Sequence, residues 1–496
     1  TVNREYTRAL IDTYAFHCTV VLHGAPHLAA LAEAKLMGTA PDPAAVRREA
    51  ARAPRSLPPA TEGHIVLTNL GPIEEALIGR AERSGVGYVA LVNDVPEALA
   101  LSDRGYHVMV GAVDDPATYR AARVEAAALV ATTLPDTTNT NVAFTVREID
   151  ATVPIAATCS SSASLDVLRL AGCDEVLQLG YMLGEGMAHR VLATGGRSQV
   201  IGRFDDLLVA EAAAESTPLV GRTLRESGLS VGSLPIVVGT WERGVFRLAE
   251  PDTLVERTTV LVLAGSADQL ATWDRDVGGD VIATGLVVVI GGGRVGRAAG
   301  AVLDDAGIDY RIVEQRPERV RDPKRYVEGD AAELEVLQRA SFDRARAVLL
   351  TTHEDDVNVY LAIYCRKLRP DVQVIARAHL PRNVSTLHRA GADAVLSYAS
   401  LGAAAIWNVL GDHDALVLAE GLDVFRAPMP PELAGTALRD AGIREATRCH
   451  VVAIARDGDM DVAPEPATVL PADADLVLIG DAAAEREFLD GYRRRA

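Results

Sequence analysis

The chain has 496 residues and a net charge of −19, with 49 Lys and Arg against 68 Asp and Glu. A phosphate polymer would be repelled by this charge, and no basic block is segregated from the rest, so a nucleic-acid partner is excluded. Hydrophobic residues make up 49% of the chain and aromatic residues 4%. That composition fits an α/β protein with a full core, divided at roughly 100–200 residues per domain into several units.

The five cysteines are odd in number and far apart, which favours a reducing cytosolic compartment over a disulfide framework or a metal site. No stretch reaches the roughly 18 apolar residues that a membrane span needs, and we find no secretory signal. Residues 1–62 form an N-terminal segment that we leave unassigned, with a linker rich in Pro and Arg at 40–60.

An internal repeat, at a spacing of 214 to 222 residues, organises the rest of the chain. LVGRTLRESGL (219–229) recurs as LAGTALRDAGI (433–443), and Gly71 recurs as Gly293. AGCDEVL (171–177) recurs as AGADAVL (390–396), and VLAG (262–265) recurs as VLIG (477–480). Because these pairs keep their order, the chain is two copies of one plan.

Each copy opens with short apolar runs that alternate with Ala-rich helical stretches, which predicts a parallel sheet covered by helices on both faces. Each copy closes with a smaller lobe of mixed helix and strand. The fold class is therefore α/β, with a Rossmann-like lobe and a small α+β lobe in each copy. The expected boundaries are 63–200 and 201–270 for the first copy, 271–284 for a linker, and 285–415 and 416–496 for the second copy.

Two helices rich in small residues, Leu179–Leu192 and Ser400–Leu410, lie between the large and small lobes. They either bridge to a neighbouring lobe or form the last helix of each sheet, and the pattern alone favours neither.

The loop GGGRVG (291–296) joins a predicted strand, Val287–Ile290, to a helical stretch, Arg297–Asp305. Its spacing suits an adenine dinucleotide: Gly291 allows a tight turn, Gly293 lets the backbone approach a pyrophosphate, and Gly296 lets helix and strand pack closely. The phosphates would then lie at the positive end of the helix. A plain tight turn is the alternative for the glycines alone.

Carboxylates follow the next two predicted strands. Glu314 ends one strand, where it can accept hydrogen bonds from ribose hydroxyls and repel a 2′-phosphate, so NAD(H) or a plain adenine nucleotide is favoured over NADP. Arg316 weakens that preference slightly, since it could meet a phosphate. Asp330 lies at the same edge of the sheet, unless it is the N-cap of a helix over Ala331–Ala340.

The acidic run TTHEDD (351–356) follows the fourth strand. Glu354, Asp355 and Asp356 could hold a divalent cation, but the favoured interpretation is that they stabilise the start of a helix near Asn358. Arg377, at the end of the fifth strand, can reach a phosphate or a neighbouring subunit. His353 and His379 beside it are interpreted as polar surface residues.

The first copy lacks most of these features. Asn69 takes the place of Gly291, and Glu74 takes that of Gly296, so that a carboxylate would face the phosphate position. The remaining counterparts of Glu314, Asp330 and Arg377 are Asn93, Ala112 and Thr158. The first lobe is therefore expected not to bind a dinucleotide in the same way.

Together these motifs resemble tandem RCK (regulator of potassium conductance) proteins, also called TrkA-type, over residues 63–496. The resemblance rests on HIVLTNLG, VVVIGGGRVGRAAG, VEGDA and LLTTHEDDVNVYLAIYCRKLRPDVQVIARA for the large TrkA-N lobes, and on PLVGRTLRESGL and PELAGTALRDAGI for the small TrkA-C lobes. LHRAGADAVLSYASLGAAAIWN is similar to GsuK-type bacterial potassium channels, in which two RCK domains follow a membrane pore.

The resemblance implies a cytoplasmic gating ring at the inner face of the membrane, built of eight domains from four chains, that controls a potassium channel or transporter pore. It implies that NAD(H), or ATP or ADP, binds the second large lobe. No selectivity-filter sequence occurs, so a channel fragment and a free-standing transporter subunit both stay open. The expected nucleotide contacts are Gly291, Gly293, Arg294, Val295, Gly296, Glu314, Gln315, Arg316, Asp330, Ala331, Thr352 and Arg377.

Two other functions are weighed against this one. An NAD-dependent oxidoreductase would need an acid or base beside the nicotinamide, and the small lobes offer no convincing His/Asp or Tyr/Lys pair. A structural module with a vestigial loop suits the first copy better than the second.

Overall fold

The computed structural model describes residues 55–493, except for 59, 193–195, 230–232, 243–244, 258, 279–284, 411–414 and 418–421. The N-terminal segment up to residue 54, including most of the Pro- and Arg-rich linker, lies outside the described residues, as does the end of the 271–284 linker. Among the helices of the described part, none has the length and apolar character to cross a membrane.

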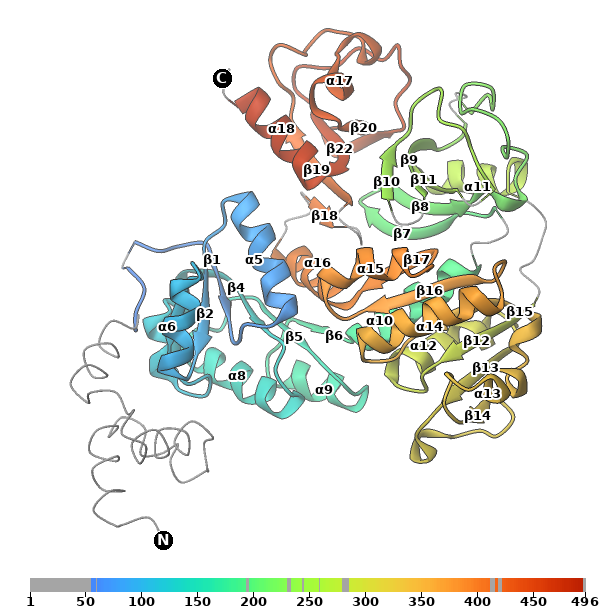
Figure 1. Ribbon diagram of the computed structural model, residues 1–496. Coiled ribbons are helices and arrows are strands. Elements are labelled where there is room, and N and C mark those ends of the chain that lie inside the picture. Colours follow the sequence, from blue (N-terminus) through green and yellow to red (C-terminus); the bar gives the residue numbers. More distant parts are fainter. Residues whose placement is uncertain are drawn as a thin grey trace.

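The first large lobe, lobe one, is a parallel six-stranded sheet with helices on both faces (Figure 1). The strand order is β3-β2-β1-β4-β5-β6, the doubly wound arrangement. Its strands are β1 His64–Leu67, β2 Tyr88–Val92, β3 Val108–Val110, β4 Ala127–Thr132, β5 Ile155–Thr158 and β6 Glu175–Leu177. Its covering helices include α5 Pro72–Ser84, α6 Val95–Asp103, α7 Pro116–Ala121, α8 Asp136–Ile149 and α9 Ala163–Leu170.

The second large lobe, lobe two, repeats this topology in the order β14-β13-β12-β15-β16-β17. Both sheets have buried strands with apolar residues on both faces, as a parallel sheet requires, so the predicted fold class is confirmed. The strands are β12 Leu286–Ile290, β13 Tyr310–Glu314, β14 Tyr326–Glu328, β15 Ala345–Leu350, β16 Gln373–Ala378 and β17 Ala394–Ser397. The helices include α12 Arg294–Asp305, α13 Leu334–Arg339, α14 Asp355–Leu368 and α15 Val384–Arg389.

Each small lobe is a five-stranded antiparallel sheet. The inner faces of the two sheets share one apolar core, in which Val209 and Val262 of the first lie with Val424 and Val477 of the second. The first sheet holds β7 Gln199–Phe204, β8 Leu207–Ala213, β9 Ile236–Glu242, β10 Val245–Leu248 and β11 Val260–Gly265. The second holds β18 Ala415–Val417, β19 Leu422–Pro428, β20 His450–Arg456, β21 Asp459–Val462 and β22 Asp475–Asp481, with helices α17 Ile443–Thr447 and α18 Ala482–Arg493.

The first small lobe extends beyond the expected boundary at residue 270. Helix α11, Ala267–Asp276, occupies part of the segment that we expected to be a linker. Trp273 of this helix is fully buried, and its indole N–H donates to the Gly196 carbonyl at 2.9 Å. The sequence 271–276 is therefore part of the small-lobe core, because a Trp side chain contributes a large buried apolar area.

The repeated motif around Gly221 and Gly435 has a conformational cause. Both glycines have positive φ, +84° and +81°, and both donate their N–H to a carbonyl across the lobe, that of Val255 and that of Leu470. A side chain would be strained at this φ, so glycine recurs in both copies.

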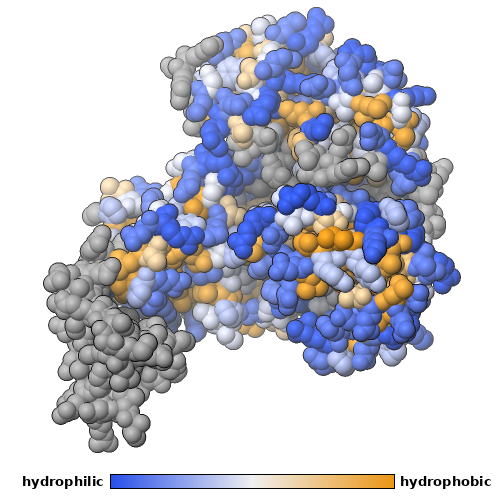
Figure 2. Space-filling view, in the orientation of Figure 1, coloured by the Kyte–Doolittle hydropathy of each residue, from blue (hydrophilic) through white to orange (hydrophobic). Residues whose placement is uncertain are grey.

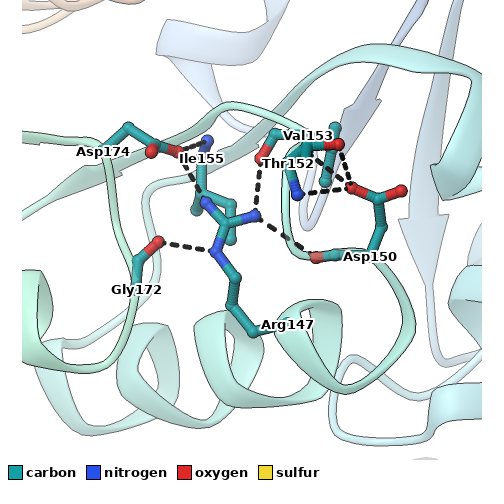
Figure 3. Close-up of polar contacts among 7 residues, drawn as sticks. All are labelled: Arg147, Asp150, Thr152, Val153, Ile155, Gly172 and Asp174. Carbon is teal, nitrogen blue, oxygen red and sulfur yellow. Dashed lines mark hydrogen bonds and ion pairs between the residues drawn. The ribbon is translucent and has the colours of Figure 1, made fainter.

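A second repeated motif is a cluster of polar contacts around an arginine, and Figure 3 shows its lobe-one copy. Arg147 of α8 donates to the carbonyls of Gly172 and Val153 and pairs with Asp174, whose carboxylate also accepts the Ile155 N–H. The matching residues of lobe two, which make the same contacts, are Arg366, Gly391, Val372, Asp393 and Val374. The repeated Ala-Gly-x-Asp sequence thus supplies a carbonyl and a carboxylate that accept hydrogen bonds from an arginine. Through these bonds the arginine connects its helix to two loops.

The two helices between large and small lobes bridge to the opposite large lobe. Helix α10, Leu179–Leu192, packs against α12 of lobe two, and α16, Tyr398–Leu410, packs against α5 of lobe one. Gly184 permits the first contact, because a Cβ there would lie 2.3 Å from the Val295 carbonyl oxygen. Of the two interpretations, bridging is the one that the structure supports, and it occurs within one chain.

Candidate functional site

A cavity of about 1130 Å³ lies at the carboxyl ends of the lobe-two strands and extends to lobe one. Most of the expected nucleotide contacts line it, as do His353, Glu354, His379 and Tyr398. The predicted residues among its walls are Gly291, Gly293, Arg294, Val295, Glu314, Gln315, Arg316, Asp330, Ala331, Thr352 and Arg377. The sequence therefore located one wall of a real cavity.

The glycine loop has the geometry that its spacing predicts. Gly291 has a φ of +109°, which makes the tight turn. A Cβ at Gly296 would lie 1.9 Å from the Gly291 carbonyl oxygen, so only glycine allows helix and strand to approach this closely. Gly293 is the N-cap of α12, and a Cβ there would meet nothing within 4 Å. That open space in front of the helix N-terminus is where an anion is favoured.

Glu314 is 5% exposed and holds the loop as well as facing the cavity. Its Oε2 accepts the Gly292 N–H at 2.7 Å, and its Oε1 accepts the Arg316 N–H at 2.9 Å. Each carboxylate oxygen has more than one lone-pair site, so acceptor capacity is left for a ribose hydroxyl. The loop-supporting role was missed by our sequence reasoning, since it depends on contact between neighbouring strands.

The second carboxylate, Asp330, also lies at this edge. Its Oδ1 accepts the Ala332 N–H at 2.9 Å, and its Oδ2 is 3.4 Å from Gln315 Nε2. Helix α13 begins only at Leu334, with Glu333 as its N-cap, so the alternative of a helix over Ala331–Ala340 capped by Asp330 was wrong. Asp330 forms a turn that leaves its side chain on the cavity wall.

Arg377 lines the cavity but is largely buried, with 8% of its surface exposed. Its guanidinium lies 5.1 Å from the centre of the Tyr398 ring and 3.4 Å from His353 Nδ1. Burial lowers the pKa of Arg377 from its ordinary value. Because a buried cation stacked on an aromatic ring is favoured by a nearby anion, this position suits a phosphate.

Two residues that we did not predict support this wall: Arg297, which lines the cavity, and Asn358, which is fully buried. Arg297 donates to the Gly292 carbonyl at 2.8 Å, and Asn358 joins the Thr352 hydroxyl, at 2.7 Å, to the Arg377 carbonyl, at 3.0 Å. Asn358 recurs as Asn139 in lobe one, so the repeat itself carried the signal that would have identified it.

The acidic run after β15 is used to hold backbone. Asp355 accepts the N–H groups of His379 and Leu380 and the amide of Asn383, at 2.6, 3.0 and 2.6 Å. Glu354 is the N-cap of α14, and Asp356 lies in its first turn. Across the ranges that the structure describes, no group of three or more His, Cys, Asp or Glu is placed to hold a metal ion. The arrangement supports the helix-start interpretation, although the helix begins at Asp355 and not near Asn358.

In lobe one, Glu74 fills the place that the glycine loop leaves open. Its carboxylate accepts the Gly71 N–H at 2.9 Å and the Thr133 hydroxyl at 2.5 Å, and it is 1% exposed. Burial raises the pKa of Glu74, an effect that these two hydrogen bonds partly oppose. The Glu74 carboxylate thus lies at the start of α5, the position that corresponds to the predicted phosphate site of lobe two.

The predicted lobe-one counterpart of Glu314, Asn93, was wrong by one residue. Gly291 follows β12 and Gly329 follows β14, the two strands that neighbour β13 in the sheet. The Gly329 N–H donates to the Glu314 carbonyl. The equivalent bond of lobe one runs from Gly111 to Val92, so that Val92 and not Asn93 is the counterpart of Glu314. The counterpart of Arg377 is confirmed as Thr158, because Asn139 donates to the Thr158 carbonyl as Asn358 does to that of Arg377.

Comparison with known proteins agrees with this architecture. The TrkA-N domain model matches residues 66–179 and 287–398, and the TrkA-C domain model matches residues 424–490. The crystal structure of the GsuK RCK domain is 33% identical, with a TM-score of 0.64, and covers 92% of this chain and 100% of its own. The GsuK channel bound to NAD is 32% identical, with a TM-score of 0.62, over 91% of this chain and 82% of its own.

A curated relative, potassium channel protein 1 of Methanocaldococcus jannaschii, is 24% identical over 197 residues. The match covers 37% of this chain and 59% of that protein, so the chain spans little more than half the length of this relative. The two TrkA-N matches coincide with the two large lobes, whose order and topology the structure repeats. The chain belongs to the family of tandem RCK proteins, with TrkA-N and TrkA-C domains.

Proposed function

We propose that this chain senses NAD(H) or another adenine nucleotide in lobe two and, by changing conformation, controls a potassium channel or transporter pore. The observation that carries the proposal is the open glycine loop, with Glu314 bound to the Gly292 N–H and the space in front of Gly293 free. NAD is the ligand named for a GsuK channel that is 32% identical to this chain.

Phosphate binding is supported by the charge around the loop. Arg294, Arg297, Arg316 and Arg377 all line the lobe-two part of the cavity, close to the N-terminus of α12. Cations and a helix N-terminus together favour a pyrophosphate. Glu314 and Asp330 at the far end favour the unphosphorylated ribose hydroxyls of NAD(H) over the 2′-phosphate of NADP.

The position of the cavity supports a regulatory role. It is bounded by both large lobes, and α12, whose N-terminus would bind the phosphates, packs against α10 of lobe one. A ligand shifts an equilibrium between conformations only as far as it binds them with different affinity, and a site shared by two lobes provides that difference. The sensing role further implies that the nucleotide is bound and not turned over.

Assembly into a ring of eight RCK domains from four chains, on the cytoplasmic side of a pore, is the form in which we propose that this sensing acts. The face shown in Figure 2 is mostly hydrophilic, with hydrophobic patches over the large lobes. Phe144 on α8 and its repeat counterpart Ile363 on α14 are 59% and 55% exposed. Exposed apolar residues that gather into contiguous patches are typical of association surfaces.

Calorimetric titration with NADH, NAD⁺, ATP and ADP tests the proposal. We expect the wild type to bind at least one of them, and Glu314→Gln to weaken binding about tenfold, because a neutral amide is a poorer acceptor for ribose hydroxyls. Glu328→Gln, at the exposed end of the neighbouring strand, is the matched control and should bind normally. In a flux assay with the pore, Glu314→Ala should flatten the nucleotide dependence.

Two results would contradict the proposal. Unchanged nucleotide response of flux in Glu314→Ala would refute the sensing site, and no heat from any of the four nucleotides would favour a structural module. Steady conversion of NAD⁺ to NADH by the pure protein with a hydroxy acid would instead revive the oxidoreductase alternative.

A further inference from the structure

The far wall of the cavity belongs to lobe one. Residues 133–137, residues 158–160 and Gly180 line it opposite the glycine loop. Helix α12 begins at Arg294, and Arg294 lies against α10, where a Cβ on Gly180 would be 3.3 Å from the Arg294 Cβ. A group that extends beyond a pyrophosphate bound at this helix N-terminus therefore meets lobe one.

The two walls differ in charge. Five arginines line the lobe-two side, where Arg319 joins the four already named. Among the described residues that line the lobe-one side, Asp136 is the sole charged residue, and the others include the hydroxyl-bearing Thr133, Thr137, Thr158 and Ser160. The first wall suits phosphates, and the second suits neutral groups that donate hydrogen bonds.

Asp136 is held in place as an ionised carboxylate. It accepts the Ser160 N–H at 2.9 Å and the Ser160 hydroxyl at 3.0 Å. Partial burial would raise the pKa of Asp136, but hydrogen bonds from the Ser164 and Ser160 side chains and backbone outweigh it and lower the pKa. The charge therefore persists at neutral pH beside the space that a ligand would enter.

Comparison with the repeat counterpart of Asp136 sharpens its role. Asp355 accepts three donors, is 9% exposed and is not among the residues that line the cavity. Asp136 caps the same loop of its own lobe, yet it is more exposed and faces the cavity. The same backbone function is thus fulfilled in both lobes, and in lobe one the carboxylate is also available to a ligand.

We propose that lobe one completes the nucleotide site and that Asp136 selects its ligand, accepting the neutral second ribose of a dinucleotide and repelling a third phosphate. This inference rests on the proposed function, since it assumes that an adenine nucleotide binds lobe two. The site then prefers NAD to ATP because of Asp136, which belongs to lobe one, whereas the adenosine is bound by lobe two.

The test is the ratio of the NAD and ATP dissociation constants of the full chain, measured by calorimetry without magnesium. Asp136→Asn keeps the shape of the side chain and removes its charge. We expect this variant to bind ATP about threefold to tenfold more tightly relative to NAD than the wild type does, the effect of one charge at moderate distance near a protein surface.

Asp150→Asn is the matched control. Asp150 also lies in lobe one and accepts turn hydrogen bonds from the Thr152 N–H and hydroxyl and the Val153 N–H, but it is not among the cavity residues. Its variant should keep the wild-type ratio. Thr137→Lys, at an exposed residue of the same wall, should shift the ratio toward ATP even if Asp136→Asn does not fold.

The outcomes separate the two proposals. If the wild type binds nucleotides but neither Asp136→Asn nor Thr137→Lys changes the ratio, or if the wild type prefers ATP, the role of lobe one is overturned and nucleotide binding by lobe two stands. If the wild type binds no nucleotide, the proposed function itself is overturned.

Discussion

The two large lobes share a backbone plan and differ where the first strand meets its helix. In lobe two, Gly296 carries no side chain at the helix N-terminus, and a Cβ on Gly293 would meet nothing within 4 Å among the described residues. In lobe one, Glu74 occupies the equivalent place and accepts the Gly71 N–H itself. A carboxylate at a helix N-terminus satisfies the same N–H groups and the same dipole as a bound phosphate would. Lobe one therefore carries its own anion.

The residues that the two lobes retain are those that hold backbone. Asn139 and Asn358 each donate to a carbonyl at the carboxyl end of the next strand, at 2.8 and 3.0 Å, and the arginine clusters around Arg147 and Arg366 share their main contacts. Several of the residues that differ face the cavity, among them Arg377 and its counterpart Thr158. The difference teaches that the scaffold needs certain side chains whether or not it binds a ligand.

The largest effect should follow from closing the lobe-two loop. In Gly296→Ala the new Cβ would lie 1.9 Å from the Gly291 carbonyl oxygen and 2.8 Å from Thr351 Oγ1, so backbone must move. We expect a loss of about 3 kcal/mol in the free energy of unfolding, measured with urea, and a loss of nucleotide binding of about a hundredfold or more.

Gly293→Ala is the control that separates folding from binding. A Cβ at Gly293 meets nothing within 4 Å, and its φ of −69° is open to any residue. Stability should stay within about 0.5 kcal/mol of the wild type, while the methyl group weakens nucleotide binding about tenfold. Equal stability of the two variants would mean that the loop tolerates a side chain at Gly296.

The second prediction tests whether the retained arginines are equivalent. Arg147→Ala and Arg366→Ala each remove bonds to two loops and leave a carboxylate without its cation, so each should lower the free energy of unfolding by about 2 kcal/mol. Chemical denaturation measures both. Arg104→Ala removes an exposed pair at 3.8 Å and should cost less than about 0.5 kcal/mol. A change of less than about 0.5 kcal/mol for Arg147→Ala or Arg366→Ala would contradict the prediction. It would mean that the recurrence of this arginine in both lobes does not reflect a contribution to stability.

Much of the fold could be predicted from the sequence because local patterns decide it. Apolar runs such as Val287–Ile290 between helical stretches indicated the parallel sheets, and the glycines at 221 and 435 recur because their φ is positive. The glycine loop was located for the same reason, since its spacing is set by contacts within a few residues.

The rest depends on contacts between distant segments. That α10 and α16 cross to the opposite lobe could not be decided, because helices rich in small residues pack equally well on their own sheet. The lobe-one wall of the cavity depends on this crossing. Asp136 could therefore not be recognised from the sequence as a residue of the cavity. The misassignment of Asn93 arose because a strand pattern does not fix its register to one residue; the backbone bond from Gly111 to Val92 does.

The smallest predicted effect concerns the carboxylate that lobe one holds in place of a ligand. Burial raises the pKa of Glu74, so the folded chain binds a proton at pH values where the unfolded chain has released it. The stability from this group is complete below the ordinary pKa of 4.5 and is lost as the pH rises through the folded value. Glu74→Gln does not titrate, so its melting temperature should rise relative to the wild type between pH 5 and pH 7.5, by an amount worth about 1 kcal/mol.

Glu74→Gln should not alter nucleotide affinity, since Glu74 is not among the residues that line the cavity. A difference for Glu74→Gln that does not change with pH would mean that the Gly71 and Thr133 hydrogen bonds fully offset the burial of the charge. The buried charge of Glu74 would then carry no net cost to the stability of lobe one.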